Sequence, residues 1–511
     1  MRTPFLPTTL AAAVVIIICG CSETMYQRES PVKQPVAGKL VLRGVTVVDT
    51  RNGSLTPNMN IVAEAGKIIS IAPTGGMAVD ASFESIDATG KFVVPGYLDM
   101  HAHVLGHPDN PTGNLALMLA NGITGYRQMH GSPALLAARR AGTLPLTLDA
   151  PVLLASPGQL LTPFNARNQE VAIETVREQK AQGADFIKIG LVSPDAALAV
   201  FAEGKRLGIP IAGHVPSDLD VVEASKAGMK SIEHLGPGNG ILVACSSDPI
   251  ALRKLAPKMP AFLKALPFKI PYADQVVTRL LKKVVVNPAA ATGPEEIAFI
   301  RQTNETFDEE KCKHVVAEFV KNGTWQVPTL IRIRSSQLAF EPEFQSDPNL
   351  SYVSKDSVES WKSITNKFSE KLTAESKEML RKTYLLDLKL VKLLDSVGVK
   401  MMTGSDVTGA GWLVPGFSLH QEFDELAKSG LTPLRVLQMT TINPAEFLGR
   451  MSTMGTVEPG KEANLVLLDA NPLESVQHLH KIFAVVRGGF YRSKRDLDVL
   501  KSKVLADPPV N

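Results

Sequence analysis

The sequence has almost no excess of charge of either sign. Its 54 lysine and arginine residues are balanced by 51 aspartate and glutamate residues, which gives a formal net charge of +3 with histidine neutral. The two signs are interspersed, and no basic stripe of the kind that neutralises a phosphate backbone stands out along the chain. The charge pattern therefore argues against nucleic acid as a partner.

Long hydrophobic runs are also scarce, and the most prominent one lies near the N-terminus. The segment LAAAVVIIICGC, from Leu10 to Cys21, follows Arg2 and is shorter than the roughly 20 apolar residues that span a bilayer. A basic residue, a short apolar run and a small residue before a cleavage point are typical of a secretory signal. We therefore expect the protein to be exported.

The end of this segment, Ile18-Cys19-Gly20-Cys21, resembles a bacterial lipobox. The resemblance implies a signal peptide over residues 1–20 and a lipid anchor on Cys21 in place of a transmembrane helix. Ser22 follows the cysteine, and by resemblance to sorted lipoproteins it favours the periplasmic side of the outer membrane. An ordinary signal peptide and an uncleaved anchor are the alternatives.

Cysteine is scarce as well. The chain has four cysteines, and two of them lie in the N-terminal segment, so that Cys245 and Cys312 remain. Nothing nearby spaces these two residues as a metal site. An oxidising compartment allows them to pair as a disulfide, and two separate buried thiols are the alternative.

The 511 residues, of which 44% are hydrophobic and 21% charged, are enough for two or more lobes, one of them large enough for a barrel. Residues 21–37 are polar and contain prolines, which is typical of a flexible tether. Short β-branched segments at 39–50, 59–73, 462–470 and 483–491 predict that residues 38–90 and 452–500 pair into one small β domain.

Between these segments, over residues 91–451, short apolar strands alternate with helical patterns, which predicts βα units and a parallel sheet. Helical insertions are expected near 237–323 and 335–395. Residues 370–398 have apolar residues at helical spacing, which favours an outer barrel helix over an amphipathic membrane helix. Eight strand candidates, the number of a closed (β/α)8 barrel, lie around Val93, Ile123, Val152, Phe186, Ile211, Ile232, Val327 and Met401.

The first candidate strand ends in a pair of histidines within VVPGYLDMHAHVLGH. Residues i and i+2 of a strand point the same way, so His101 and His103 share a face about 7 Å apart, close enough to converge on one metal ion. Two histidines at a polar strand end, without any metal, are the alternative interpretation.

Other candidate strands carry ionisable side chains at their ends. Lys188 lies among apolar residues in GADFIKIG, and a buried ammonium is costly unless it is paired or chemically changed. His214 follows IPIAG, His234 follows SIE, and Asp406 follows VKMMTGS. In a barrel, all of these positions lie at the end where active sites are found.

Together these residues resemble the amidohydrolase superfamily, with His-x-His on the first strand, a lysine on the fourth, histidines on the fifth and sixth and an aspartate on the eighth. The likeness extends from about Lys39 to Tyr491 and includes VPGYLDMHAH, GHV, EHLG, VPTL, INPAEFLG and GTVEPGKEANLVLLD. Within the superfamily the chain is similar to the imidazolonepropionase and Xaa-Pro dipeptidase-like group, in which GADFIKI-type strands carry the lysine.

This resemblance implies an α/β fold, a (β/α)8 TIM barrel with a small β-sandwich lobe, and a centre of two divalent ions bridged by Lys188 as a carbamate. Zinc suits the donor set, and manganese, iron and cobalt are alternatives. The implied ligands are His101, His103 and Asp406 for the first ion and His214 and His234 for the second.

The predicted activity is metal-dependent hydrolysis of a carbon–nitrogen bond in a small amide, such as a dipeptide or an N-acyl amino acid. Asp406 is the candidate general base, which then donates the proton to the departing nitrogen. A cyclic-amide or lactone hydrolase and a non-catalytic binding lipoprotein are the alternatives. The sequence leaves oligomerisation open.

Candidates for substrate contact are less specific. Arg127, Arg332 and Arg334 are suited to hold a substrate carboxylate. His107 and His130 follow the first two strands, although YRQMH departs from the VRD-x-G pattern of similar sequences. His420 is expected to support a ligand or to pack within a helix.

Overall fold

The computed structural model describes residues 38–76, 80–105, 110–256 and 294–506. The predicted signal peptide, the tether, Cys21 and His107 lie outside these ranges, so the expectations attached to them stay predictions. No helix within the described part of the chain is long and apolar enough to cross a membrane.

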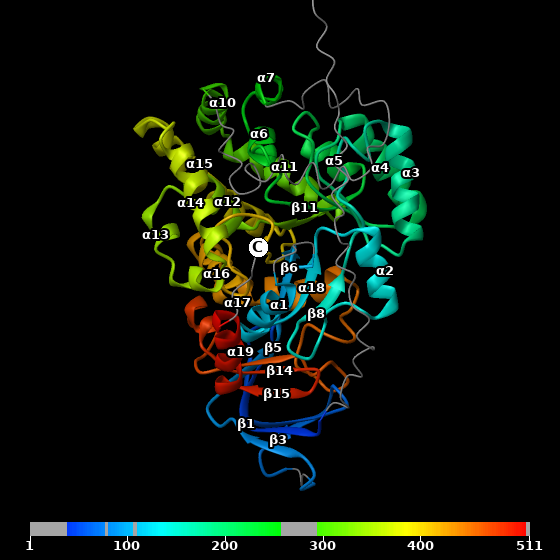
Figure 1. Cartoon of the computed structure of the whole chain (residues 1–511), viewed down its shortest axis with the longest axis vertical. Helices are drawn as coiled ribbons and strands as arrows, with labels where there is room; N and C mark the ends of the chain where they lie inside the picture. The colour runs from blue at the N-terminus through cyan, green and yellow to red at the C-terminus, as the bar shows by residue number, and fades with distance from the viewer. Residues whose placement is uncertain (1–37, 77–79, 106–109, 257–293, 507–511) are drawn as a thin grey trace, which may run out of the picture.

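Both ends of the chain contribute to one eight-stranded sheet, drawn in blue and red in Figure 1. The strands run in the order β15-β14-β13-β5-β1-β2-β3, and β4 also pairs with β1. Because β13 pairs with β5, the sheet joins the two ends, as the sequence predicts. The strand pairing describes one continuous sheet, and its packing as a β-sandwich stays a prediction. The strands are β1 (Leu40–Val48), β2 (Leu55–Glu64), β3 (Lys67–Pro73), β4 (Glu84–Asp87), β5 (Phe92–Pro95), β13 (Leu465–Leu468), β14 (Ile482–Arg487) and β15 (Phe490–Ser493).

Strand β1 changes partners at a glycine. Residues 40–43 pair with β4, whereas Thr46 and Val47 pair with β5, and the register shifts between the two stretches. Gly44 lies there with φ +71°, and a Cβ on it would come within 2.6 Å of the Thr89 hydroxyl. A left-handed residue with no side chain produces a bulge, which increases the local twist. The bulge therefore allows β1 to contact β4 and β5 along the same edge.

The remaining strands are parallel and form two sheets, β6-β7-β8 and β9-β10-β11-β12. Isolated parallel bridges join Leu161 to Ile189, Gln326 to Met401 and Ala102 to Val407. The two sheets and the segment 401–407 thus follow one another in the cyclic order expected for eight barrel strands. Their bounds are β6 (Tyr97–Ala102), β7 (Ile123–Gln128), β8 (Val152–Ala155), β9 (Ile187–Ile189), β10 (Ile211–Gly213), β11 (Met229–Glu233) and β12 (Trp325–Val327).

One strand assignment from the sequence is wrong. The candidate around Val93 is not the first parallel strand, because Val93 belongs to β5 of the terminal sheet and pairs with Val47 and Leu467. The apolar run divides at Gly96, where any Cβ would lie only 2.0 Å from the Thr124 hydroxyl. The first parallel strand, β6, begins directly after this glycine.

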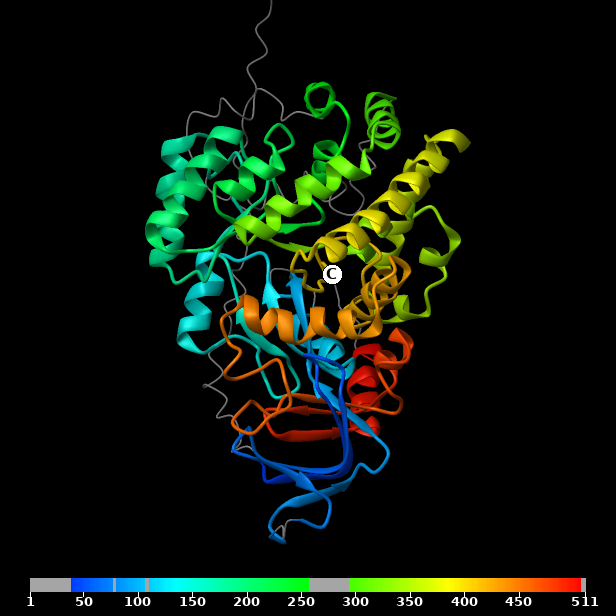
Figure 2. The same cartoon turned by 180° about the vertical axis from the view of Figure 1, so that it is seen from behind.

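Helices surround the parallel strands (Figures 1 and 2). Helix α4 illustrates the local signals, because the Ser193 side chain caps its start, Pro194 occupies its first turn and Gly208 ends it with φ +67°. Helix α15 lies within the predicted helix 370–398. The helices are α1 (Pro111–Ala120), α2 (Pro133–Ala141), α3 (Gln169–Ala181), α4 (Pro194–Leu207), α5 (Val221–Lys226), α6 (Gly240–Ala244), α7 (Pro249–Leu255), α10 (Pro294–Glu305), α11 (Glu309–Asn322), α12 (Leu330–Leu338), α13 (Pro342–Gln345), α14 (Lys355–Ser369), α15 (Ala374–Val397), α16 (Phe417–Lys428), α17 (Pro433–Thr440), α18 (Ile442–Phe447) and α19 (Lys494–Ala506).

Cys245 and Cys312 form a disulfide, so the structure favours pairing over two separate thiols. Cys245 ends α6 and Cys312 lies in the first turns of α11, and both side chains are buried. The bond closes a loop with a sequence separation of 67. It therefore connects the two sides of the insertion that follows β11.

We expect reduction of this disulfide to lower the free energy of unfolding by roughly 2–5 kcal/mol, because a long closed loop restricts the unfolded chain. Urea unfolding with and without reductant measures the difference. The double variant C245A/C312A is the control, and its unfolding should not respond to reductant. An identical response of wild type and control would contradict the prediction.

Candidate metal centre

The side chains predicted as metal ligands all lie at or just beyond the ends of parallel strands. His101 is the second-to-last residue of β6, and His103 directly follows the strand. Lys188 is the central residue of β9. His214 directly follows β10, His234 directly follows β11, and Asp406 lies in the segment 401–407. The full set is His101, His103, Lys188, His214, His234 and Asp406.

The structure brings these side chains together. The imidazole of His101 lies with its ring centroid 4.5 Å from that of His234 and 5.4 Å from that of His103. The rings of His214 and His234 are 5.3 Å apart. Asp406 Oδ1 lies 3.3 Å from His101 Nε2 and 3.0 Å from His103 Nε2. Residues from four different strand ends thus converge on one small volume.

Backbone strain accompanies this convergence. His234, Thr329 and Asp406 have φ values of 56°, 48° and 60°, in the left-handed region that residues other than glycine rarely adopt. The peptide N–H of Asp406 donates to the His101 carbonyl at 2.7 Å, which ties the strained residue to β6. Such conformations cost about 1–3 kcal/mol each and persist where the surrounding structure holds them.

Lys188 is buried inside this cluster, with 1% of its surface exposed. Its Nζ lies 3.4 Å from His101 Nε2. Burial lowers the pKa of the ammonium to about 8, although the carboxylates of Glu233 and Asp406 act in the opposite direction. A lysine with this pKa is uncharged in about half of the molecules at pH 8, and an uncharged amine is a nucleophile.

The remaining histidines are kept neutral. Burial is the largest cause that lowers the pKa of His103, His214 and His234, so that their imidazoles have lone pairs available near neutral pH. Burial acts to raise the pKa of Asp406, but the imidazoles of His101 and His103 hold it well below its ordinary value. The cluster therefore combines neutral nitrogen donors with an ionised carboxylate.

The spacing of these donors fits a divalent metal ion. Two ligands each about 2.0–2.1 Å from a tetrahedral zinc ion lie about 3.3 Å apart, close to the distances from Asp406 Oδ1 to the two nitrogens of His101 and His103. Donor atoms of His101, His234 and Asp406 all lie within 4.8 Å of one another. The chemistry and the spacing of the side chains thus suit the ion that the sequence predicts.

Glycines leave the space that this crowding requires. A Cβ on Gly404 would lie 2.6 Å from the Cβ of His101, and a Cβ on Gly409 would lie 2.7 Å from both Asp406 Oδ1 and a ring carbon of His103. Real Cβ atoms do not approach other atoms so closely. Both positions therefore require glycine if the histidines and the aspartate are to keep their places.

Two residues that contact the histidines from behind are not among the predicted site residues. Glu233 Oε2 lies 2.7 Å from His101 Nδ1, and the Thr329 hydroxyl lies 2.6 Å from His234 Nδ1. Both are fully buried. A glutamate within the apolar strand MKSIE carries the same signal that singled out Lys188, namely a charge where burial is costly. Thr329 offers no comparable signal.

The predicted substrate contacts are placed differently from one another. The guanidinium of Arg127 is 1% exposed and is bound to Glu233, Ser231 and the Met100 carbonyl, which does not favour the predicted contact with substrate. Arg332 Nε lies 3.1 Å from Asp406 Oδ2 and is thus at the centre.

The other candidates contact different partners. The ring of His130 lies 6.5 Å from that of His103, and burial lowers its pKa to about 4. Arg334 instead pairs with Glu343 and Glu425. His420 Nε2 donates to the Asn121 carbonyl, and the residue packs in α16, as one of its two expected roles predicts.

A model of the amidohydrolase family matches residues 386–490. This stretch of the chain is similar to the amidohydrolase family. An adenine deaminase of Rubrobacter xylanophilus is 27% identical over 161 residues, which is 30% of this chain and 26% of the deaminase. The match to this curated relative thus spans about a quarter of its length. Asp406 lies inside the range of the amidohydrolase match, whereas the histidines of the centre precede it.

Solved amidohydrolase structures share the fold over almost the whole chain. A bottromycin amidohydrolase aligns with a TM-score of 0.65 and 21% identity, covering 93% of this chain and 91% of its own. A Xaa-Pro dipeptidase with bound methionine in its active site aligns with a TM-score of 0.56 and 17% identity, covering 89% of this chain and all of its own. At these identities the likeness concerns the fold.

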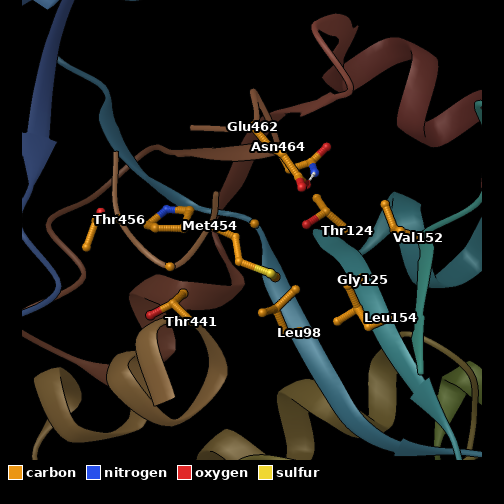
Figure 3. Close-up of a pocket in the computed structure, with 13 residues that line it drawn as sticks. Leu98, Thr124, Gly125, Val152, Leu154, Thr441, Met454, Thr456, Glu462 and Asn464 are labelled. Atoms are coloured by element: carbon orange, nitrogen blue, oxygen red, sulfur yellow. Dashed lines mark hydrogen bonds between the residues drawn. The ribbon is translucent and has the colours of Figure 1, made fainter. Parts of the chain in front are cut away.

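A separate pocket lies at the opposite end of the parallel strands (Figure 3). Leu98, Thr124 and Leu154 line it from β6, β7 and β8, and Met454 and Asn464 close it from the C-terminal part of the chain. About 20 Å³ of it is open to a water molecule, which is room for roughly one water. This pocket is therefore too small for an amide substrate. Its lining residue Leu98 lies near the start of β6, whereas His101 and His103 lie at and beyond the end of that strand.

We expect Gly409→Ala to fold but to lose most of its capacity to hold a divalent ion, because the added methyl group displaces Asp406 or His103. Zinc content after dialysis against a weak chelator measures this loss. Gly38→Ala is the matched control, since a Cβ there meets nothing within 4 Å. Full zinc content in Gly409→Ala would contradict the geometry.

Proposed function

We propose that the protein is a metal-dependent hydrolase that cleaves a carbon–nitrogen bond in a small amide, such as a dipeptide or an N-acyl amino acid. The observation that carries this proposal is the contact of Asp406 with both His101 and His103, beside the buried Lys188. Imidazoles, an ionised carboxylate and an amine able to form a carbamate are donors suited to divalent ions, which such a hydrolysis uses to activate water. The likeness to a Xaa-Pro dipeptidase structure agrees with a dipeptide-sized substrate.

The proposal includes a closed eight-stranded barrel that places the site at one end. Support comes from the parallel bridges that join Leu161, which lies beyond the end of β8, to β9, β12 to the segment 401–407, and that segment to β6. Since the carboxyl ends of all eight strands then meet at one rim, residues far apart in the chain share a pocket. The small sheet built from both ends covers the region near the other rim (Figure 1).

Two divalent ions, with zinc the best match to the donors, complete the site in this proposal. His101, His103 and Asp406 would hold one ion, and His214 and His234 the other, with Lys188 between them. When bound, such ions lower the pKa of water toward neutrality and polarise the carbonyl of the substrate. The protein's contribution is to supply neutral imidazoles and an ionised carboxylate in fixed places.

Asp406 is the residue that we assign to proton transfer. Its carboxylate is ionised near neutral pH and is therefore able to accept a proton when water attacks the amide. It then gives this proton to the departing nitrogen, so that an amine leaves instead of an amide anion. Arg332 contacts the second oxygen of Asp406 and fixes its orientation. The same guanidinium is the best placed cation for a substrate carboxylate.

We assign Lys188 the role of a carbamate ligand. The carbamate forms when the uncharged amine of Lys188 adds to carbon dioxide and releases one proton. The pKa of about 8 supports this reaction, because an ordinary lysine is almost fully protonated at that pH. The product is an anion in place of a buried cation, with two oxygens available as ligands. Formation of the carbamate thus removes the buried ammonium, whose burial without a partner is costly.

Attachment to the cell envelope is part of the proposal as well. The lipobox-like sequence at Cys21 predicts export and a lipid anchor on the periplasmic side of the outer membrane. The disulfide between Cys245 and Cys312 supports an oxidising compartment, since such bonds are rare in the cytosol.

The function is tested with purified protein loaded with zinc and a library of dipeptides, N-acyl amino acids, cyclic amides and lactones. Release of amino acids from the first two classes supports the proposal. Turnover of rings alone would favour a cyclic-amide or lactone hydrolase. Metal loading without turnover of any class would favour a binding protein, and a protein that takes up no divalent ion would contradict the proposal.

We expect Asp406→Asn to keep most of the bound metal but to lose at least about 100-fold in kcat, because the side-chain amide of asparagine cannot accept the proton from water. Steady-state kinetics and zinc analysis on the same sample measure the two effects. Asp387→Asn is a matched control, since Asp387 is 4% exposed and Asp406 5%, but Asp387 lies on α15. Near-normal turnover in Asp406→Asn would exclude the assignment.

We expect carbon dioxide uptake on Lys188 of the metal-free protein to rise as the pH increases through about 8. The sign follows from the lowered pKa, since the reactive uncharged amine increases with pH about two units earlier than for an ordinary lysine. A carbamate carbon signal from 13C-labelled bicarbonate measures the uptake. Lys188→Met, which keeps the length of the side chain, should lack this signal. Equal signals in both proteins would contradict the assignment.

A further inference from the structure

Behind the centre, the structure contains a buried ion pair that the proposed chemistry does not use. Arg127 Nη2 lies 2.8 Å from Glu233 Oε1, and the two residues are 1% and 0% exposed. Arg127 is on β7 and Glu233 on β11. In the cyclic order of the eight strands these two are four places apart, so the ion pair spans the interior from one side to the other.

Both members of the pair are held by further contacts. The Arg127 guanidinium donates to the Met100 carbonyl at 2.6 Å and to the Ser231 hydroxyl at 3.2 Å. The rings of Phe186 and Phe447 lie 5.5 Å and 5.2 Å from its central carbon, which restricts the planar group further. The guanidinium therefore has little freedom to reach a substrate.

The carboxylate oxygen of Glu233 that does not contact Arg127 faces His101. Its Oε2 lies 2.7 Å from His101 Nδ1, whereas Oε1 accepts hydrogen bonds from Arg127 and Ser231. Because the buried guanidinium of Arg127 pairs with this carboxylate, Glu233 is the acceptor in these contacts. Nδ1 of His101 is therefore the donor to Glu233, and the opposite ring nitrogen, Nε2, faces Asp406 and Lys188.

We propose that Glu233 and Arg127 are positioning residues, which hold the His101 imidazole with Nε2 directed toward the proposed metal site. Glu233 accepts from Nδ1 and so fixes the orientation of the ring, and Arg127 holds the carboxylate of Glu233 in place. Neither residue touches the substrate. This inference rests on the proposed metal site, and it replaces the expectation that Arg127 binds a substrate carboxylate.

His234 is supported in a different way. Its Nδ1 lies 2.6 Å from the neutral hydroxyl of Thr329 and not from a carboxylate. A charged partner makes a hydrogen bond about twice as strong as a neutral one does. The hydrogen-bond partners of His101 and His234 therefore differ in strength. In this proposal Glu233 affects the affinity for the ion that His101 would bind.

Zinc affinity of the metal-free protein, measured by competition with a coloured chelator, tests the pair. We expect Glu233→Gln to weaken the binding of zinc by about 10- to 100-fold, as loss of such a partner usually does. Glu422→Gln is the matched control, because Glu422 is also a glutamate with 0% exposure but lies on α16, where its carboxylate accepts from the peptide N–H of Ile331. Unchanged affinity in Glu233→Gln would overturn the proposal.

A double-mutant cycle tests whether the two residues act together. Arg127→Met should weaken zinc binding about as much as Glu233→Gln, and the double variant should show about the same loss and not the product of the two losses. The double variant also contains no unpaired buried charge, so it remains informative if either single variant fails to fold. Independent effects that multiply would contradict a joint role.

The tautomer is tested without metal. In protein with 15N-labelled histidine, we expect an exchange-protected Nδ1 proton signal that is absent from His101→Asn, shifts in Glu233→Gln and stays in place in Glu422→Gln. Absence of this signal from wild type would overturn the inference even if zinc binds. If the protein binds no divalent ion but retains the signal, the proposed function fails while the positioning of His101 stands.

Discussion

The need to bury charges of both signs at the ends of parallel strands governs this structure. Lys188, Glu233 and Arg127 are almost completely inaccessible to water, and each would cost several kcal/mol if it lacked a partner. Their mutual placement offsets that cost. Because partners come from different strands, the charged groups can be satisfied only when the strands have assembled.

The same arrangement determines the chemical character of the centre. Burial keeps the imidazoles of His214 and His234 neutral and lowers the pKa of Lys188, whereas neighbouring cationic and imidazole groups keep Asp406 and Glu233 ionised. A set of neutral nitrogen donors, ionised carboxylates and a reactive amine results from one low-dielectric environment. Glycines at the rim and left-handed residues at the strand ends hold this set in place.

Much of the candidate site could be predicted because it depends on local pattern. His101 and His103 have the two-residue spacing of a strand face, and Lys188 stands out because a cation interrupts an apolar segment. The position of the first parallel strand could not be read in the same way. Val93 and Tyr97 belong to one apolar run, and this run divides between two sheets at Gly96, where Thr124 leaves no room for a side chain.

The sequence by itself determined which residues are candidate metal ligands and near which strand ends they lie, since periodicity and the cost of burial are local properties. Only the tertiary structure decided how the residues behind them act. Arg127 and Glu233 are 106 residues apart in the chain, so no local pattern relates them. In our proposal this contact makes Arg127 a support for His101, because its guanidinium donates hydrogen bonds to the Met100 carbonyl, Ser231 and Glu233 inside the protein.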